Sequence, residues 1–328
     1  MLIPPQLEID NDILKLISAI DANRIYLSSL QVKPEIVEKV QRISYLKSSL
    51  FSARIEGAKQ SLTQLDEKDR EQIEIFNILS AIQFIRSKIQ SNTKITPTLI
   101  QKIHTLVMKN VYAHAGSFRT EQSAIFNQAG IAVYVTPSPT QIKKLIEELT
   151  NYSNSKIESF PLIIAFLSHL IFEKIHPFLD GNGRVGRLLI YAILQSKGYN
   201  FGLHVAFEEY LDNHKDQYYH HLDTGLKNIN KYVLFMLQAF LEQTEKMKET
   251  INQELQKKQI LILPPRQEEI FLIIKDHPMI SFDSLKRRFL KVPERTLRYD
   301  LKKLTDLELV IKVGITRGAL YLVKEESE

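Results

Sequence analysis

The sequence of 328 residues contains no cysteine. This excludes disulfide bridges, thiolate zinc sites and a cysteine nucleophile, and makes a reducing cytoplasm the simplest location. Long apolar runs are also missing, since the longest apolar stretches, 160–172 and 232–241, are too short to span a bilayer. The first residues lack the basic and apolar regions of a secretory signal. We therefore expect a cytoplasmic protein that does not partner a membrane.

The composition is that of a folded protein with a modest positive charge. Hydrophobic residues make up 44% of the chain and charged residues 25%, a balance that excludes global disorder. The length suits two or three domains. A formal net charge of +5 and a pI of about 9.0 are compatible with an anionic partner such as a nucleotide or a nucleic acid.

Helical spacing dominates the first 257 residues. Between Ile36 and Ile55 apolar residues recur at three-, four- and five-residue intervals, and Pro34 and Gly57 suit the start and the end of that helix. Further helices are expected at 68–90, 97–108, 140–152, 161–174, 185–197, 208–227 and 232–257.

One segment favours strands instead of helices. The β-prone runs 123–126 and 131–135 flank a glycine-containing turn at 127–130, which predicts a hairpin within 117–136.

A shift of composition near Leu263-Pro264-Pro265 indicates a separate C-terminal unit over 258–328. Its expected elements are three short helices and two strands with Gly314 and Gly318 between them, at 267–275, 281–289, 293–304, 309–311 and 319–323. The preceding segment, 242–257, is charged and fits a connecting helix.

The residues from His176 to Arg187 read His-Pro-Phe-Leu-Asp-Gly-Asn-Gly-Arg-Val-Gly-Arg. The turn 181–183 precedes a predicted helix, whose first N–H groups lack internal acceptors and whose dipole is positive at that end. Such a turn is a candidate anion site, although glycines before a helix can also serve only to form a turn. It is neither a P-loop nor a Rossmann turn, because no Lys-Ser/Thr follows it and no strand precedes it.

Four side chains around this turn have the chemistry of phosphate transfer. Arg184 and Arg187 share one side of the helix and can bind phosphate oxygens. Asp180 suits Mg²⁺ that takes its other ligands from phosphates and water. His176 has the ordinary pKa of a base that works at neutral pH. The alternatives are a solvated basic face, a helix cap and a structural histidine.

The segment resembles the signature of the Fic family, His-x-Phe-x-(Asp/Glu)-Gly-Asn-Gly-Arg-x-x-Arg, at every defined position. The resemblance implies transfer of AMP from ATP to a Tyr, Thr or Ser hydroxyl of a protein, with release of pyrophosphate. His176 would then be the base, Phe178 a core anchor and Asp180 the Mg²⁺ ligand. The residues implied to bind the phosphates of ATP are Gly181, Asn182, Gly183, Arg184 and Arg187.

Two more segments extend the resemblance. The hairpin at 117–136 resembles the family's flap, which aligns a target segment by strand addition. Residues 52–57, Ser-Ala-Arg-Ile-Glu-Gly, match the family's inhibitory pattern (Ser/Thr)-x-x-x-Glu-(Gly/Asn). Ser52 and Glu56 share a helix face, with Gly57 at its end. The implied brake is a pair between Glu56 and Arg187 that leaves ATP in an unproductive pose.

The expected fold is therefore mainly α: a Fic-type helical core with a β-hairpin flap, an N-terminal helical region and a small winged helix-turn-helix domain. We place the boundaries at 1–94, 95–257 and 258–328. The resemblance to a winged helix makes DNA a candidate partner, through Arg295, Arg298, Lys302 and Lys303, with Leu297, Leu301 and Leu304 as the buried side.

Several alternatives remain open at this point. The chain could be a DNA-binding regulator whose Fic-like core senses nucleotides, a protein-binding module with a vestigial ATP site, or an enzyme that also removes AMP. The target protein is unknown, self-modification is expected, and a homodimer is one option. An intact His176 favours an active transferase, because a vestigial site has no need of the base.

Overall fold

A computed structural model describes residues 2–59, 70–126, 132–256, 263–277, 279–307, 309–313 and 319–324. The chain forms two compact units, Met1–Gln256 and Lys257–Glu328. Each unit has a hydrophobic core of its own. The N-terminal region and the core that we predicted as 1–94 and 95–257 thus lie together in the first unit. No helix of the described residues is long and apolar enough to cross a membrane.

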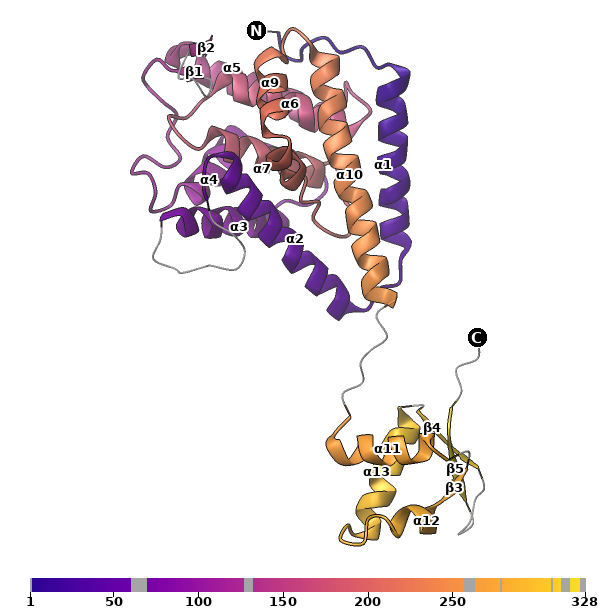
Figure 1. Cartoon of the computed structure of the whole chain (residues 1–328). Coiled ribbons are helices and arrows are strands. Elements are labelled where there is room, and N and C mark those ends of the chain that lie inside the picture. Colours follow the sequence, from indigo (N-terminus) through magenta and orange to yellow (C-terminus); the bar gives the residue numbers. More distant parts are fainter. Residues whose placement is uncertain are drawn as a thin grey trace. The chain divides into compact units, whose positions relative to one another are not determined.

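The first unit is helical, with one small hairpin (Figure 1). Its helices are α1 (Asn11–Ser29), α2 (Pro34–Ile55), α3 (Arg70–Lys88), α4 (Pro97–Val107), α5 (Pro139–Asn154), α6 (Pro161–Ile175), α7 (Asn182–Ser196), α8 (Glu208–Asn213), α9 (Lys215–Thr224) and α10 (Ile229–Gln256). The mainly α prediction is confirmed, and most predicted helices lie within a few residues of these bounds.

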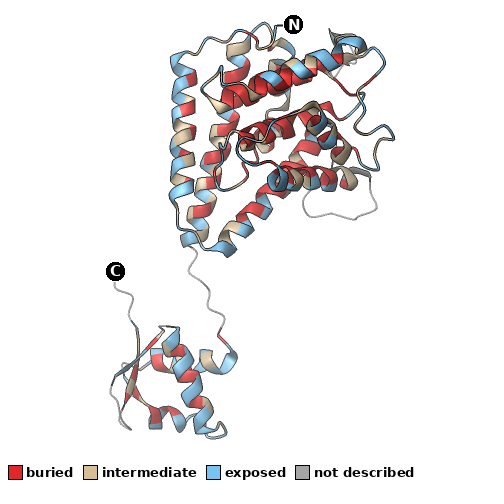
Figure 2. Ribbon diagram, turned by 180° about the vertical axis from the view of Figure 1, so that it is seen from behind, coloured by how far each residue is buried: buried red, intermediate tan, exposed pale blue. Residues whose placement is uncertain are grey.

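Helix α6 is the centre of this unit. All its residues from Leu162 to Ile175 are buried, as its nearly continuous apolar sequence requires. It packs against α7, α5 and α10. In Figure 2 the central helices are red on most sides, whereas the outer ones are red on one side only. The loop between α6 and α7 is therefore anchored at both ends in the core.

Three helical features differ from the sequence prediction. Helix α1 was not predicted; it begins after Asp10, whose side chain accepts the N–H of Ile13, and it lies along α10 (Figure 1). The helix predicted at 208–227 is broken at His214, where the ring stacks on Tyr210 at 4.0 Å. Helix α7 begins at Asn182, three residues before the predicted start.

The predicted hairpin is present in a shorter form. Its strands are β1 (Ala124–Phe126) and β2 (Ala132–Val135), paired antiparallel with Ile125 opposite Tyr134. The predicted turn at 127–130 and Ile131 lie outside the described residues.

The second unit contains the expected three helices and two strands. They are α11 (Pro265–Lys275), α12 (Phe282–Lys286), α13 (Glu294–Asp306), β4 (Val310–Val313) and β5 (Leu320–Val323). An unpredicted strand, β3 (Ile280–Ser281), pairs with β5 and gives an antiparallel sheet in the order β3-β5-β4. Gly314 and Gly318 lie outside the described residues. The interpretation of this unit as a winged helix stays a prediction.

Helix α13 separates its apolar and basic residues. Leu297, Leu301 and Leu304 are buried as predicted, while four cations are exposed: Arg295, Arg298, Lys302 and Lys303. The carboxylate of Asp300 is buried and pairs with Arg266, its Oδ2 lying 2.6 Å from Nε. This acidic residue therefore dilutes the exposed charge of α13 less than its position in the sequence suggests.

Candidate functional site

The candidate site is built around the loop that joins α6 to α7. Its first residue, His176, and its last, Gly181, have φ values of 49° and 79° in the left-handed region. A Cβ at Gly181 would lie 2.7 Å from the sulfur of Met108, so this position requires glycine.

The side chain of Asn182 fixes the loop. Its Oδ1 accepts the N–H of Phe178 at 3.0 Å, and its Nδ2 donates to the carbonyl of the same residue at 2.8 Å. Both polar groups are thereby used, and the side chain is buried. What Asn182 can offer an anion is its backbone at the start of α7, within the turn predicted to bind phosphate.

A second histidine supports the loop from α4. The His104 ring stacks on Phe178 at 3.7 Å between centroids. Its Nδ1 accepts the N–H of Gly116 at 2.7 Å, which leaves Nε2 to donate to the carbonyl of Asp180 at 3.0 Å. Burial lowers the pKa of His104 to about 4, so the ring is neutral, as these two bonds require. No motif in the sequence marks His104 as part of the site.

Arg119 links the flap to the loop, and it too was not predicted as a site residue. The residue is buried, and its Nε donates to the carbonyl of His176 at 2.8 Å. On the flap side, Nη2 donates to the Thr136 hydroxyl at 2.9 Å and to the Pro137 carbonyl at 2.7 Å. One guanidinium group therefore fixes the loop that carries His176 relative to the residues that directly follow β2 of the flap.

His176 is held as a neutral imidazole. Burial, with the Arg119 charge in the same direction, lowers its pKa to about 4, against the opposing effect of the Glu173 carbonyl near the ring. No hydrogen-bond partner reaches its Nδ1 within the described part of the chain. A neutral imidazole has one nitrogen free to accept a proton, which is the state that a base requires.

Arg187 is enclosed by the end of α2. Its side chain is 1% exposed. The guanidinium donates from Nε to the Ser52 hydroxyl at 3.0 Å, and from Nη2 to the Ser52 carbonyl at 2.8 Å and to Glu56 Oε1 at 2.9 Å. Burial alone would lower the pKa of Arg187, but the Glu56 carboxylate raises it. The structure thus joins the two predicted motifs at this arginine.

The Glu56 carboxylate also lies against the first turn of α7. A Cβ at Gly183 would collide with Oε1 of Glu56 and come within 3.1 Å of Nη1 of Arg187. Only glycine allows this approach. The carboxylate therefore occupies the position beside the helix N-terminus where an anion is expected to bind.

Gly57 ends α2 directly after this glutamate. Its φ is +110°, and its N–H donates to the carbonyl of Arg54 at 3.0 Å, while Ala58 donates to Ala53 at 3.2 Å. These two bonds are the Schellman arrangement, which favours glycine. The contribution of Gly57 is thus to stop the helix so that Glu56 lies at its C-cap.

Arg184 faces the other side of the loop. Its Nη2 lies 3.0 Å from Asp180 Oδ1, and its Nη1 lies 2.9 Å from Oε2 of Glu74 on α3. Asp180 remains 51% exposed. Glu74 was missed because nothing near it in the sequence points to the loop.

Part of this set lines a cleft of about 970 Å³, the size of a cofactor site, whereas the predicted residues Asp180, Gly181, Asn182 and Arg184 are not among its lining residues. His176, Gly183, Arg187 and Glu56 line it, together with Ile125 of the flap. Helix α9 forms another wall of the cleft, with Tyr218 and Tyr219 among its lining residues. The cleft brings the base, the anion turn and the inhibitory glutamate to one place, and it lies entirely within the first unit.

Comparison with known proteins identifies the domain that carries this cleft. Residues 94–194 match the Fic/DOC family. The chain is 28% identical over 197 residues to a protein adenylyltransferase Fic of Drosophila willistoni, and 29% identical over 195 residues to that of Drosophila virilis. These matches cover 56% and 55% of the chain but only 38% and 39% of the relatives, so the chain spans about two fifths of their length.

Solved structures share the fold. A Fic family protein from Desulfovibrio desulfuricans G20 aligns over 99% of both chains with a TM-score of 0.70 and 19% identity. Residues 134–508 of Fic-1 from C. elegans align over 74% of this chain and 73% of that one, with a TM-score of 0.62 and 19% identity.

Proposed function

We propose that this chain, whose residues 94–194 match the Fic/DOC family, transfers AMP from ATP to a Tyr, Thr or Ser hydroxyl of a target protein or of itself. Pyrophosphate is the second product. The observation that carries the proposal is the neutral His176 in one cleft with Arg187 and the N-terminal turn of α7. The name of the Drosophila relatives, protein adenylyltransferase, agrees with it.

The chemistry follows from these positions. The hydroxyl oxygen attacks the α-phosphorus, His176 takes the hydroxyl proton, and the bond from the α-phosphorus to the bridging oxygen breaks. The electron pair leaves with pyrophosphate. The backbone N–H groups at the start of α7 bind phosphate oxygens, as helix N-termini do, and the flap strand holds the target segment by main-chain pairing.

Mg²⁺ fits the donor set on the loop. Within the described residues no three His, Cys, Asp or Glu side chains gather into a metal cage. A single, half-exposed carboxylate, Asp180, lies beside the anion turn, and Mg²⁺ is commonly held by one carboxylate together with phosphates and water. The ion would neutralise phosphate charge, and Asp180 would hold it.

The pair between Glu56 and Arg187 is the proposed brake. While the Glu56 carboxylate lies against Gly183, this carboxylate competes with a phosphate of ATP for the N-terminal turn of α7 and for the Arg187 guanidinium. ATP then binds without the alignment that transfer needs. Removal of the carboxylate frees both groups.

The test is incubation of the full chain with α-labelled ATP and Mg²⁺. We expect Glu56→Gly to raise self-labelling about 5- to 150-fold, the range of couplings between sites. The intact mass of Glu56→Gly should rise by the mass of one AMP. His176→Ala, added to that variant, should abolish both the labelling and the gain of mass.

The matched control is Glu38→Gly, which removes an exposed carboxylate from the same helix. It should label like the parent. The proposal of a brake is wrong if Glu56→Gly binds ATP but labels no better than the parent, and the proposal of AMP transfer is wrong if no variant gains the mass of AMP.

DNA binding by the second unit is a second candidate function. The exposed cations of α13, with the leucines of the same helix turned inward, support it. Arg298 contributes less than its neighbours, because its Nη2 lies 2.7 Å from Glu294 and its guanidinium covers the Phe282 ring.

A further inference from the structure

A second cavity of about 130 Å³ lies apart from the catalytic cleft. An apolar cavity of about 150 Å³ binds benzene, so this space is slightly smaller than that cavity and close to the size of one aromatic ring. Its walls come from α2, α3, α7, α10 and the segment 199–207, and the residues that matter here are Gln41, Tyr45, Arg86, Tyr191, His204 and Phe207. The proposed transferase function makes no use of it.

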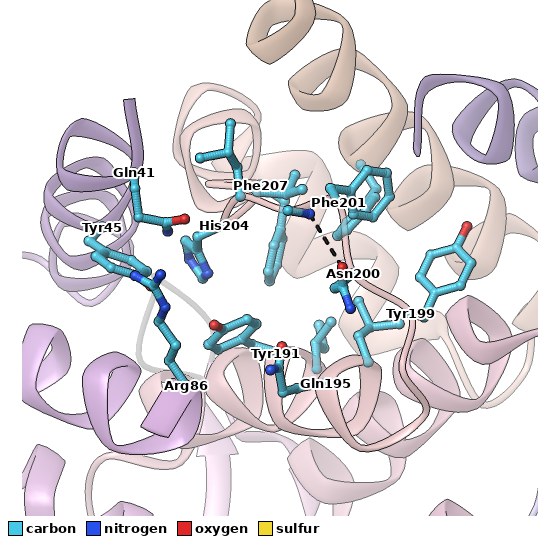
Figure 3. Close-up of a pocket in the computed structure, with 16 residues that line it drawn as sticks. Gln41, Tyr45, Arg86, Tyr191, Gln195, Tyr199, Asn200, Phe201, His204 and Phe207 are labelled. Carbon is cyan, nitrogen blue, oxygen red and sulfur yellow. Dashed lines mark hydrogen bonds between the residues drawn. The ribbon is translucent and has the colours of Figure 1, made fainter. Parts of the chain in front are cut away.

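Two buried side chains turn unpartnered polar atoms into this cavity (Figure 3). His204 is 3% exposed, and neither of its ring nitrogens has a hydrogen-bond partner; Gln41 is 6% exposed, and its Nε2 has none. Burial lowers the pKa of His204 to about 3, so the neutral ring offers one donor and one acceptor. Buried polar groups in folded proteins are nearly always bonded, which indicates that something polar completes this site.

Of the described residues that line the cavity, Arg86 alone is charged. It is exposed, and its Nη1 donates to the Tyr45 hydroxyl at 2.9 Å. Within the described residues no carboxylate pairs with it, and the cavity has no acidic lining residue. A guanidinium has five N–H donors and binds carboxylates well. The charge of the site therefore selects an anion.

Aromatic rings form the walls beside the two polar residues. The His204 ring lies edge-on to Tyr191 at 4.5 Å and 5.3 Å from Tyr45. Figure 3 shows these rings, with Phe207, facing the same space. Such rings favour a planar, aromatic guest.

We propose that this cavity binds a small aromatic carboxylate with a hydroxyl group on its ring. The ring lies against Tyr191 and Phe207, and the carboxylate pairs with Arg86 at the mouth. The hydroxyl bonds with His204 and Gln41 in the interior. A ligand placed here contacts α2, the helix whose other end holds Ser52 and Glu56 against Arg187.

The experiment is calorimetric titration of the full chain with 4-hydroxybenzoate, and with neutral 4-hydroxybenzyl alcohol for comparison. The acid should bind saturably with a Kd tighter than about 5 mM, which is modest for a ligand of this size. Arg86→Gln should weaken the acid about tenfold, the effect of a lost charge-assisted bond, and leave the alcohol unchanged. The matched control, Arg42→Gln, removes an exposed charge from α2 outside the cavity and should bind like the parent.

A second variant tests the interior of the cavity. His204→Phe keeps an aromatic ring but removes both nitrogens, so it should weaken 4-hydroxybenzoate more than benzoate. Absence of saturable binding by the parent would mean that the cavity holds water only, and equal binding by Arg86→Gln and the parent would place the ligand elsewhere. Either result overturns the proposal, and neither bears on AMP transfer.

Discussion

In the proposed mechanism Arg187 serves two partners that exclude each other. In the structure its guanidinium bonds with Ser52 and Glu56, although it lies one turn from the glycine turn that would hold phosphate. Buried charges need a partner at all times, because an unpaired one costs several kcal/mol. Arg187 would be paired with the Glu56 carboxylate in the inhibited state and with a phosphate in the active state. Because its charge has a partner in both states, this residue is suited to a switch.

The pH profile of transfer tests the state of His176. Burial lowers its pKa to about 4, so its base form should persist far below the ordinary value of about 6.5. We expect kcat/KM of the Glu56→Gly variant to stay level as the pH falls through 6.5 and to decline only toward pH 4. Circular dichroism at each pH shows that the protein stays folded. An acid limb centred near 6.5 would contradict the buried, neutral imidazole.

Glu173 predicts a pH dependence of stability. Its Oε1 is buried without a hydrogen-bond partner, and burial, reinforced by the Glu56 charge, raises its pKa from 4.5 to about 8. Between these values the folded state binds more protons than the unfolded state, so the free energy of unfolding falls as the pH rises. Glu173→Gln should remove this fall, which amounts to at most about 1.4 kcal/mol per pH unit.

The measurement is denaturant unfolding of parent and variant across pH 5 to 8, on either side of neutrality. The Glu38→Gln variant, changed at an exposed site, should keep the slope of the parent. Parallel curves for Glu173→Gln and the parent would show that this carboxyl is ionised in the folded protein.

The grouping of site residues was predictable where one short segment holds them. His176, Glu56 and Arg187 come from two contiguous motifs, and the structure brings them together in one cleft. His104 and Arg119 reach the loop from 76 and 57 residues away in the sequence. Their contacts arise only from the packing of α4 and the flap on the loop, and a single sequence does not encode that packing in any local spacing.

At the scale of elements, α2 is positioned by α8 and α9. Arg54 on α2 lies 3.1 Å from Asp212, and Lys215 donates to the Arg54 carbonyl at 3.1 Å. The hydroxyl of Tyr219 donates to the carbonyl of Ile55 at 2.9 Å. These contacts satisfy the last carbonyls of α2, which have no partners inside the helix, and they hold the turn that carries Glu56.

Weakening this support should release the brake in part. Asp212→Asn removes one charge from a partly exposed pair, worth about 0.5–1 kcal/mol. We expect self-labelling with α-labelled ATP to rise about two- to fivefold, less than in Glu56→Gly. Asp12→Asn alters an exposed pair on α1 and should have no effect. Unchanged labelling of Asp212→Asn would mean that α9 alone holds the end of α2.

The presence of most helices could be predicted from the spacing of apolar residues, but the break at His214 and the start of α7 could not. Helix α2 was predicted within its observed bounds because Pro34 and Gly57 mark them. The break at His214 depends on a ring contact with Tyr210, and the early start of α7 depends on the bonds of Asn182 to Phe178. Such local side-chain contacts do not alter hydrophobic periodicity.

At the scale of the whole molecule, the two proposed functions fall on different units. The catalytic cleft is lined only by residues of the first unit. The second unit has a core of its own around Ile270, Leu297 and Tyr321. Its surface charge on α13 can therefore be changed without touching the cleft, and DNA binding and AMP transfer can be measured as separate properties of the full chain.

If α13 contacts DNA phosphates, binding must depend steeply on salt, because each neutralised phosphate releases counterions. We expect the full chain to shift duplex DNA in a gel at low salt. Arg295→Gln and Lys302→Gln should each reduce the slope of log K against log salt by about 0.9. Lys275→Gln removes an exposed charge from α11 and should keep the slope of the parent. Slopes that stay equal in all three variants would exclude α13 as the contact surface, since a helix that meets phosphates cannot lose two cations without losing counterion release.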